Sequence, residues 1–415
     1  MRFLSLVFLL TLSLQIVAQQ VIDIPWNVSL HAIPHLNSSA KESNLNLSTD
    51  GSELYFFSRR GGMTWSNRDS HEASLRHSDG DIWRSRKENG KWSLPLNLQY
   101  ANNFFNQDEA QLIGDKLYFQ DWTTGWETQD GPYYILDHHN FERKGLSSEI
   151  CRFFIDNDFH ATDGASFSND GSLFYFTAGT NYQADMNLFF AKKINNKWTY
   201  PVLLNISTNN NERTCYITKD NNYLFFASNG YHQRNDLDIY YIALSDPKTI
   251  YHPTGAINDT NNNCGFIISS IDCSAYCVID EDIYHVQFNT NKPSFCQTLH
   301  ERKEIIHFET AKHTPLNNEL KQLLLNVLPL KHQLSAVRIA AHTDKVGNSD
   351  YNEQLARRRA AEIKTILIKN GVRETIITTN SFGENRPLIN TPTAEITNRR
   401  CEITLIYTAT PALSE

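Results

Sequence analysis

The sequence predicts a multidomain chain, with an all-β propeller of five to six blades followed by an α+β domain. Up to about residue 295, hairpin-like segments recur about every 45 to 65 residues, a spacing typical of four-stranded propeller blades. From residue 300 onward, strand and helix patterns alternate instead. We therefore expect a propeller over 19–298 and an α+β domain over 299–409, with a leader at 1–18 and a tail at 410–415.

The leader has the pattern of a secretory signal peptide. A single arginine precedes an unbroken apolar run from Phe3 to Leu14, and cleavage is expected after Ala18. A transmembrane anchor is the alternative, but the run of about 16 apolar residues is short for a span, which needs roughly 20. The sequence therefore predicts an exported protein.

Repeated hairpins carry the propeller prediction. Each copy has a strand, an Asp/Asn/Gly turn and an aromatic-rich strand, which is the pattern of a β-hairpin. The clearest copies are "LNLSTDGSELYFFSRR" (45–60), "ASFSNDGSLFYFTAGT" (165–180) and "CYITKDNNYLFFASNG" (215–230), with weaker ones at 110–122 and 264–279. A third strand follows most copies, so five blades are clear. Residues 21–43 either add a strand that closes the ring or belong to a degenerate sixth blade.

The C-terminal elements follow in the order β-α-β-α-β-β. The helix beginning near Asp350 is expected to start with a capping box formed by Asp350 and Glu353, and to end at Gly371. The expected elements are a strand at 305–310, a helix at 315–330, a strand at 334–344, a helix at 350–371, and strands within 375–387 and 398–408.

Charge divides at the same boundary. Residues 300–415 hold 16 Lys and Arg against 13 Asp and Glu, a net of +3, whereas the preceding residues carry −11. A mildly basic module on an acidic propeller argues against nucleic acid as a partner and leaves room for a small anionic or zwitterionic ligand.

Seven cysteines suit an oxidising compartment, and their odd number leaves at least one free thiol or an intermolecular bond. The four that lie close together in sequence could pair among themselves: Cys264, Cys273, Cys277 and Cys296. Cys151, Cys215 and Cys401 are expected to be buried small hydrophobic residues.

Four motifs of the C-terminal region, "IHFETAK", "IAAHTDKVGNSDYNEQLARRRAAEIKTIL", "SFGENRP" and "NRRCEI", resemble, in order and spacing, the OmpA-like peptidoglycan-binding domain. The hairpin repeats, with their "SxDGxxLYF" and "DIY" pieces, resemble TolB-like and WD-related β-propellers. The first resemblance covers about 105 residues and implies non-covalent binding of the peptidoglycan stem peptide through its diaminopimelate residue. The second resemblance concerns the fold and says very little about function.

The OmpA-like resemblance also implies site residues. An aspartate and an arginine hold the free amino-acid end of diaminopimelate in this family, and these roles fall on Asp344 and Arg359. Physical reasoning agrees, because an ammonium and a carboxylate on one carbon need a fixed anion and a fixed cation close together. The other residues that match the family's site are Thr343, Asn352, Leu355, Glu309, Arg399 and Arg400.

Simpler readings accompany these assignments. Asp344 and Arg359 could form an internal ion pair, and His342 is expected to be structural. Ala341 and Ala356 replace a glycine and a serine that are usual in the family, which could weaken the binding of the ligand. The module could also have lost its ligand and serve as a packing unit.

No catalytic motif stands out, so a non-enzyme without cofactor or metal is expected. The sequence lacks G-x-S-x-G, H-E-x-x-H and P-loop patterns, and "DHH" at 137–139 is a weak metal candidate. We expect a cell-wall-associated scaffold whose propeller binds an outer-membrane or periplasmic protein, with an outer-membrane or secretion assembly as one candidate. The alternative is a carbohydrate-binding or hydrolytic or lyase-like propeller, which acids and a histidine converging at the central channel would favour.

Overall fold

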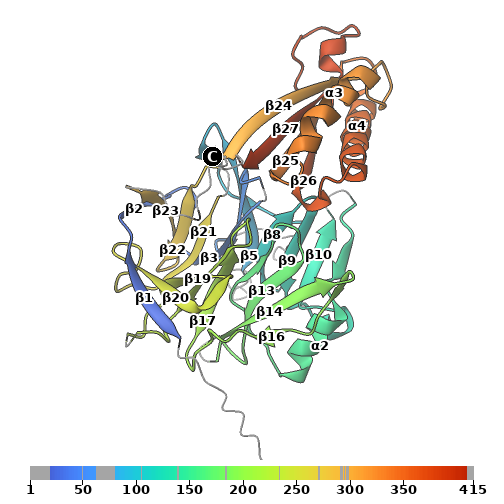
Figure 1. Ribbon diagram of the computed structural model, residues 1–415. Helices are drawn as coiled ribbons and strands as arrows, with labels where there is room; N and C mark the ends of the chain where they lie inside the picture. Colours follow the sequence, from blue (N-terminus) through green and yellow to red (C-terminus); the bar gives the residue numbers. More distant parts are fainter. Residues whose placement is uncertain are drawn as a thin grey trace, which may run out of the picture.

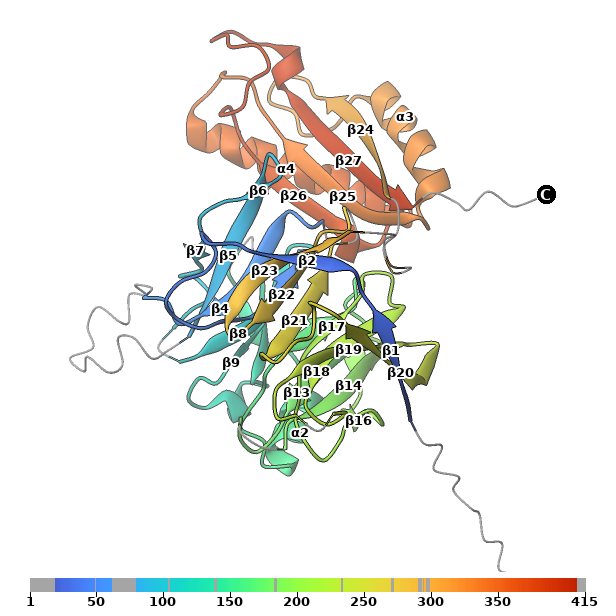
Figure 2. The ribbon, with the colours of Figure 1, turned by 90° about the vertical axis from the view of Figure 1, so that its left-hand side faces the viewer.

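The computed structural model describes residues 19–408 except 49, 62–79, 104, 138–139, 183–184, 233, 270–271, 290–292, 294 and 296–298. The expected leader and tail, residues 1–18 and 410–415, lie outside the described residues. A β-rich N-terminal body carries a C-terminal α+β domain on one of its faces (Figures 1 and 2). Within the described ranges, no helix is long and apolar enough to cross a membrane.

The N-terminal body contains five sheets of four or five strands in the described residues. The first sheet comprises β3 (Glu42–Leu47), β4 (Glu53–Ser58), β5 (Asp81–Glu88), β6 (Lys91–Trp92) and β7 (Leu96–Asn97). The second comprises β8 (Gln107–Ile113), β9 (Lys116–Asp121), β10 (Tyr133–Asp137) and β11 (Arg143–Gly145). The third comprises β12 (Ala165–Phe167), β13 (Leu173–Ala178), β14 (Asn187–Ile194), β15 (Lys197–Trp198) and β16 (Val202–Leu203).

The last two sheets each take a strand from the beginning of the chain. The fourth comprises β17 (Glu212–Ile217), β18 (Tyr223–Ser228), β19 (Asp238–Ala243), β20 (Asp246–Thr254) and β1 (Gln20–Pro25). The fifth comprises β21 (Asn263–Ile268), β22 (Ala275–Ile279), β23 (Asp282–Phe288) and β2 (Val28–Ala32). Figure 2 shows β1 beside β20, to which it is parallel, and β2 beside β23, to which it is antiparallel.

The sheets follow one another through their first strands. β3 contacts β8, β8 contacts β12, β12 contacts β17, β17 contacts β21, and β21 contacts β3. Within residues 21–43, β1 and β2 complete the edges of two existing sheets and β3 begins the first sheet, so no sixth sheet occurs in the part of this region that the structure describes.

The first strands share a local distortion. In four of them the pairing register shifts around a residue with positive φ, namely Asn44 (49°), Glu109 (58°), Thr214 (42°) and Gly265 (60°). Such a bulge bends the strand and redirects its side chains. Neighbouring sheets meet at the bulges; for example, the amide of Gly265 donates to Oγ1 of Thr214 at 2.9 Å.

The "S-x-D-G" turns of the repeats are built by their aspartates. Oδ1 of Asp50 accepts from the amide of Ser52 at 3.0 Å, and Asp170 and Asp220 make the equivalent bond at 3.1 Å. A carboxylate that accepts from the backbone two residues on fixes a tight turn, which explains why the motif recurs.

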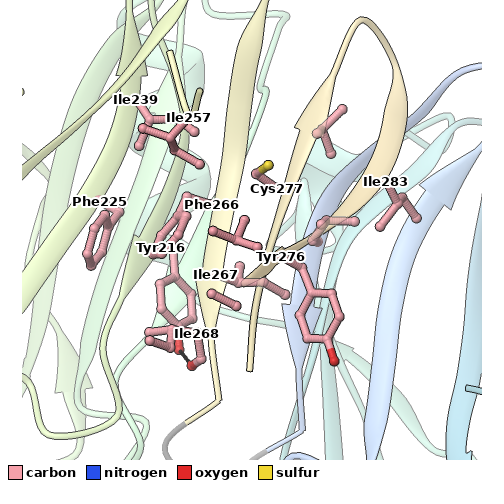
Figure 3. Packing of buried hydrophobic residues seen from close by; sticks show 14 of the residues in the cluster. Tyr216, Phe225, Ile239, Ile257, Phe266, Ile267, Ile268, Tyr276, Cys277 and Ile283 are labelled. Atoms are coloured by element: carbon pink, nitrogen blue, oxygen red, sulfur yellow. Dashed lines mark hydrogen bonds between the residues drawn. The ribbon is translucent and has the colours of Figure 1, made fainter. Parts of the chain in front are cut away.

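Aromatic and aliphatic side chains fill the space between sheets. Figure 3 shows one cluster at the fourth and fifth sheets, where Tyr216, Phe225 and Phe266 pack together. The hydroxyl of Tyr216 donates to the carbonyl of Ile268 at 2.6 Å, so its polar end is satisfied inside the core.

Helix α2 (Ser148–Asp156) was not expected from the sequence, which shows no long helical period in this region. Oγ of Ser147 accepts from the amide of Glu149 at 3.2 Å and caps the helix. Phe153 and Phe154 are buried and pack against the second and third sheets. A short 3₁₀ turn, η1 (Trp126–Thr128), lies beside this helix. At only nine residues, α2 gives too weak a periodic signal to be recognised.

The C-terminal domain has the predicted order β-α-β-α-β-β, so this part of the fold prediction is confirmed. Its sheet has the strand order β24-β27-β25-β26, and α3 and α4 cover one face (Figure 1). The elements are β24 (Leu299–His307), α3 (Asn317–Val327), η2 (Leu328–Leu330), β25 (Leu334–Ala341), α4 (Ser349–Lys369), η3 (Glu374–Ile376), β26 (Ile377–Ser381), η4 (Ile396–Asn398) and β27 (Arg400–Thr408).

The expected capping box at the start of α4 is wrong. The cap is Asn348, whose side chain accepts from the amide of Tyr351 at 2.7 Å, so the helix begins before Asp350. Glu353 instead accepts from the hydroxyl of Ser381. The helix ends as predicted, because Gly371 adopts φ of 90°, which favours glycine.

The cysteine expectation is only partly correct. Cys264 and Cys277 are free thiols, so the four clustered cysteines do not form two internal pairs. Cys273 is disulfide-bonded, and Cys296 lies outside the described residues. Cys151, Cys215 and Cys401 are free and buried, as expected.

Turns of the first three sheets contact the C-terminal domain. Asp50 forms an ion pair with Arg338 (Oδ2 to Nε, 2.9 Å). Asp115, in the β8–β9 turn, forms one with Lys364 of α4 (Oδ2 to Nζ, 2.5 Å). Nδ2 of Asn169 donates to the carbonyl of Ser335 at 3.5 Å. The turn residues of the repeats thus have a second role that their local turn chemistry does not reveal.

Candidate functional site

Asp344 lies in the loop after β25 and is buried, with 4% of its surface exposed. Its Oδ2 lies 2.8 Å from Nη1 of Arg399, with which it forms an ion pair, and it accepts from the amide of Glu395 at 3.3 Å. The preceding residue, Thr343, is fixed by a bond from its amide to the carbonyl of Gly383 at 2.8 Å. The carboxylate is therefore held in a defined position at the end of a rigid strand.

Arg359 lies on α4 and is fully buried, with 0% of its surface exposed. Its guanidinium donates to three backbone carbonyls, those of Glu309 at 3.3 Å, Lys312 at 3.0 Å and His342 at 2.8 Å. It also lies over the ring of Phe308, 4.8 Å from the centroid. Burial lowers its pKa to about 10. Arg359 therefore joins the loop after β24 to the loop after β25.

Asp344 and Arg359 do not form an ion pair within the described residues, because Asp344 pairs with Arg399 instead. The guanidinium of Arg359 has five N–H groups, and three of them serve the carbonyls, so one on Nη1 and one on Nη2 remain. The simple alternative of an internal Asp344–Arg359 pair thus does not describe this structure.

Two buried oxygen acceptors in this region have no hydrogen-bond partner among the described residues, and neither do the two ring nitrogens of the adjacent His342. The two oxygens are Oγ1 of Thr343 and Oδ1 of Asn352, on side chains with 1% of their surface exposed. Nδ2 of Asn352 donates to Oε2 of Glu384 at 2.6 Å, which fixes the orientation of the amide. Buried polar atoms normally have a partner, so each of these calls for a ligand atom or a water molecule.

The remaining expected site residues are Leu355, Glu309, Arg399 and Arg400. Leu355 is buried at 3%, and the side chain of Glu309 is exposed while its carbonyl serves Arg359. Arg400 is buried, and its Nε donates a hydrogen bond to Oε1 of Glu402 at 2.7 Å. Arg399 contacts Asp344, whereas the adjacent Arg400 does not, so only one of this arginine pair belongs to the charged centre.

His342 is structural in its surroundings. Its ring stacks on Phe382, with the centroids 5.2 Å apart and an interplanar angle of 20°. Burial, and then the positive charge of Arg400, lower the pKa of His342 to about 4. The ring is therefore neutral at pH 7. In the described ranges, no group of three His, Cys, Asp or Glu is placed to hold a metal ion.

The two departures from the family pattern lie in the core. Ala341 and Ala356 both have 0% exposure and pack in the cluster between the sheet and α4. A hydroxyl at position 356 would face this apolar cluster. The methyl group of Ala356 thus contributes to packing.

Sequence reasoning named Arg399 without a separate role and did not name Glu384 or Glu395. The position of Glu384 within "GENRP" was visible, but nothing in the sequence indicated its bond to Asn352. The contact made by Glu395 uses its backbone amide, to which the side chain gives no clue.

A second polar cluster lies where the first strands of the N-terminal sheets meet. Nδ2 of Asn44 donates to Oδ2 of Asp108 at 2.7 Å and to Oδ1 of Asp163 at 3.2 Å. Glu109 accepts from the hydroxyl of Tyr133 at 2.6 Å and the amide of Gly164 at 2.9 Å. Burial raises the pKa of Glu109 to about 7, and burial and then Glu109 raise that of Asp108. Of the "DHH" motif, His138 and His139 lie outside the described residues.

Comparisons with known proteins concern mainly the C-terminal domain. The OmpA family model matches residues 312–400. The chain is 41% identical to outer membrane porin F of Pseudomonas fluorescens over 68 residues, which are 16% of this chain and 21% of that protein. It is 35% identical to outer membrane protein A of Bordetella avium over 103 residues (24% and 53%). It is 31% identical to the peptidoglycan-associated lipoprotein of Buchnera aphidicola over 108 residues (24% and 60%). The chain thus spans less than two thirds of each relative.

Solved structures resemble both parts. The peptidoglycan-associated lipoprotein from Burkholderia pseudomallei is matched over 25% of this chain and 90% of that chain, at 22% identity and a TM-score of 0.22. TolB from Acinetobacter baumannii is matched over 62% and 57%, at 11% identity and a TM-score of 0.35. Both scores are low, so the description of the fold rests on the strands and sheets themselves. Residues 312–400 form a domain of the OmpA family, joined in this chain to an N-terminal body of five β-sheets.

Proposed function

We propose that the protein binds peptidoglycan non-covalently through its OmpA-family domain, by holding the diaminopimelate residue of the stem peptide at Asp344. The observation that carries the proposal is a buried carboxylate accompanied by two buried acceptors without partners, Oγ1 of Thr343 and Oδ1 of Asn352. The relative from Buchnera aphidicola is named a peptidoglycan-associated lipoprotein, which agrees with this ligand.

The chemistry of the free end of diaminopimelate suits these groups. An ammonium has three N–H donors and needs three acceptors, which Asp344, Thr343 and Asn352 can supply. The neighbouring carboxylate needs a cation, and the candidates are the N–H groups of Arg399 and Arg359 for which the described residues show no partner. Arg399 uses Nε on the carbonyl of Phe308 and Nη1 on Asp344, so its Nη2 is available. Charge-assisted bonds of this kind would give most of the affinity.

Sedimentation with purified peptidoglycan sacculi tests the proposal. Asp344→Asn keeps the size of the side chain and removes its charge, so we expect at least a tenfold loss of sedimented protein at a fixed amount of sacculi. Asp350→Asn is the matched control, because Asp350 is exposed on the first turn of α4. If Asp344→Asn sediments like the wild type and the control, stem-peptide binding at this residue is refuted.

We also propose that the five N-terminal sheets form a closed propeller, ending near residue 298, that serves as a scaffold for a protein partner. The contact between β21 and β3 and the return of β1 and β2 support closure. Several relatives are outer membrane proteins by name, which supports a location at the cell wall and outer membrane. Cross-linking in intact cells, followed by identification of the attached proteins, tests this role. Recovery of the protein in the cytoplasmic fraction alone would contradict it.

One observation favours the alternative of a hydrolytic or lyase-like propeller: Asp108, Glu109 and Asp163 lie around Asn44 and Gly164. However, all three carboxylates accept bonds from protein groups, and Asp163 also pairs with Arg213 at 2.9 Å. These bonds suit a structural role. Release of reducing ends from peptidoglycan glycan, abolished by Glu109→Gln, would support the alternative.

A further inference from the structure

A cleft of about 620 Å³ lies between the two parts of the chain. One wall consists of α4 and β26, and the other consists of strands and turns of the first and second sheets, including β5 and the β8–β9 turn. Its volume falls within the range of about 300–1,000 Å³ typical of small-ligand sites. Neither domain alone forms this cleft, so an OmpA-family domain without the N-terminal body would lack it.

The cleft is rich in guanidinium groups that are weakly engaged. Arg358 lines it, is exposed, and has no carboxylate partner within the described residues. Arg357 pairs with Glu353 at 3.2 Å and Arg86 pairs with Glu53 at 2.8 Å, but both arginine side chains are more than half exposed. The Arg357–Glu353 pair is exposed enough to contribute little and to be readily exchanged for a ligand, whereas Glu53, the partner of Arg86, is buried. The cleft therefore offers both donors and acceptors, and one cation, Arg358, that has no carboxylate partner among the described residues and lies 6.0 Å from the ring centroid of Tyr351.

Two further features indicate what kind of ligand would fit. Phe141 lines the cleft with 57% of its surface exposed, and its ring lies 5.4 Å from that of Tyr100. Thr378 also lines the cleft; this side chain is only 9% exposed, and its buried hydroxyl has no hydrogen-bond partner among the described residues. An exposed aromatic plane beside hydroxyl, carboxylate and guanidinium groups suits a sugar ring, which presents an apolar face and many hydroxyls.

We propose that this cleft binds the glycan strand of peptidoglycan, an amino-sugar polymer with lactyl groups, while the Asp344 site holds the stem peptide. This inference rests on the proposed function, since it concerns a second part of the same polymer. The lactyl carboxylate, free where the peptide has been removed, is the partner expected for Arg358.

The spacing of the two sites agrees with one polymer reaching both. Asn352, a residue of the proposed stem-peptide site, bonds Glu384, whereas Glu353 lines the cleft, and adjacent residues of a helix point about 100° apart. The two sites thus lie on two flanks of α4, whose diameter with side chains is about 10–12 Å. In the stem peptide, two residues and the lactyl group separate diaminopimelate from the sugar, and three such units extend over roughly 10 Å.

Calorimetric titration of the full chain with two soluble probes tests the inference. The first probe is peptide-free glycan strands released from sacculi by an amidase, and the second is the free tripeptide that ends in diaminopimelate. We expect Arg358→Glu and Phe141→Asn to weaken glycan binding at least fivefold and to leave tripeptide binding unchanged. Asparagine suits position 141, because Phe141 has φ of 55°. Arg152→Glu, an exposed change on α2, is the control.

The outcomes separate the two proposals. If the wild type does not bind glycan strands, binds poly-glutamate equally well, or binds glycan equally in all variants, the cleft inference is overturned. If Asp344→Asn still binds the tripeptide like the wild type, the proposed function fails, whatever the glycan titration shows. Loss of both ligands in Arg358→Glu would indicate a damaged domain, so Phe141→Asn, on the other wall, then decides the question alone.

Discussion

Arg359→Ala should destabilise the OmpA-family domain, and not only remove a ligand contact. The fully buried guanidinium donates to the carbonyls of Glu309, Lys312 and His342 and so joins all three. Hydrogen bonds to charged groups contribute about 1.5–3 kcal/mol each, and they are not additive within one network. Opposing this, the pKa lowered to about 10 corresponds to a burial cost of about 3 kcal/mol. We therefore expect a net loss of about 2–4 kcal/mol.

The distribution of tryptophan makes the assay specific. All seven tryptophans lie before residue 199, so their fluorescence reports on the N-terminal body. The two longest helices, α3 and α4, belong to the C-terminal domain, so helical circular dichroism reports mainly on that domain. In a urea titration we expect Arg359→Ala to lower the midpoint of the dichroism change by roughly 1–3 M, and to shift the fluorescence midpoint much less.

Arg358→Ala is the matched control. Arg358 is the exposed neighbour of Arg359, so its replacement should change stability by no more than about 0.5 kcal/mol. If Arg359→Ala and Arg358→Ala have the same dichroism midpoint, the reasoning about the three carbonyls is wrong. The expected result also means that loss of peptidoglycan binding in Arg359→Ala cannot by itself assign a ligand contact, which is why Asp344→Asn is the sharper test.

Three more results follow from individual contacts. The pKa of His342 is lowered to about 4 in the folded protein, so on acidification the unfolded chain takes up a proton at this residue before the folded chain does. The stability of the C-terminal domain should therefore fall as pH falls from about 6.5 towards 4. His342→Gln should flatten this dependence of stability on pH, and an unchanged dependence would contradict the assignment. Asp115→Asn removes the shorter of the two carboxylate contacts of Lys364, whose side chain is 15% exposed. It should lower the free energy of unfolding by about 1–3 kcal/mol and separate the unfolding transitions seen by dichroism and by fluorescence. Coincident transitions in the variant would show that this pair does not couple the domains. Ser147→Ala removes the N-terminal cap of α2 and should lower the free energy of unfolding by about 1 kcal/mol, measured as a lower midpoint of the fluorescence transition in urea. An unchanged midpoint would mean that the cap is dispensable.

The C-terminal fold was predictable because its signals are local. Alternation in β25, the amphipathic pattern of α4 and Gly371 at its end all follow from side-chain periodicity and backbone preference. The start of α4 was mispredicted because Asp350 and Glu353 match a capping box, whereas Asn348 lies closer to where the strand ends and caps the helix through the amide of Tyr351.

The site was only partly predictable, because its geometry depends on contacts between distant residues. Asp344 and Arg399 are 55 residues apart in sequence, and no spacing rule could pair them. The bonds of Arg359 to backbone carbonyls could not be predicted for a similar reason, since backbone carbonyls leave no trace in the sequence. The cleft between the domains was also invisible, because it exists only where two separately predictable units meet.

The return of β1 and β2 to the fourth and fifth sheets places a constraint on the order of folding. These strands are synthesised first, yet their partners, β20 and β23, end at residues 254 and 288. Until then, the first strands of the chain have no edge to join, and until they join, two sheets keep open edges that could pair with other chains. A chain of this design would therefore benefit from a chaperone that holds residues 20–32 until nearly three hundred residues have been synthesised.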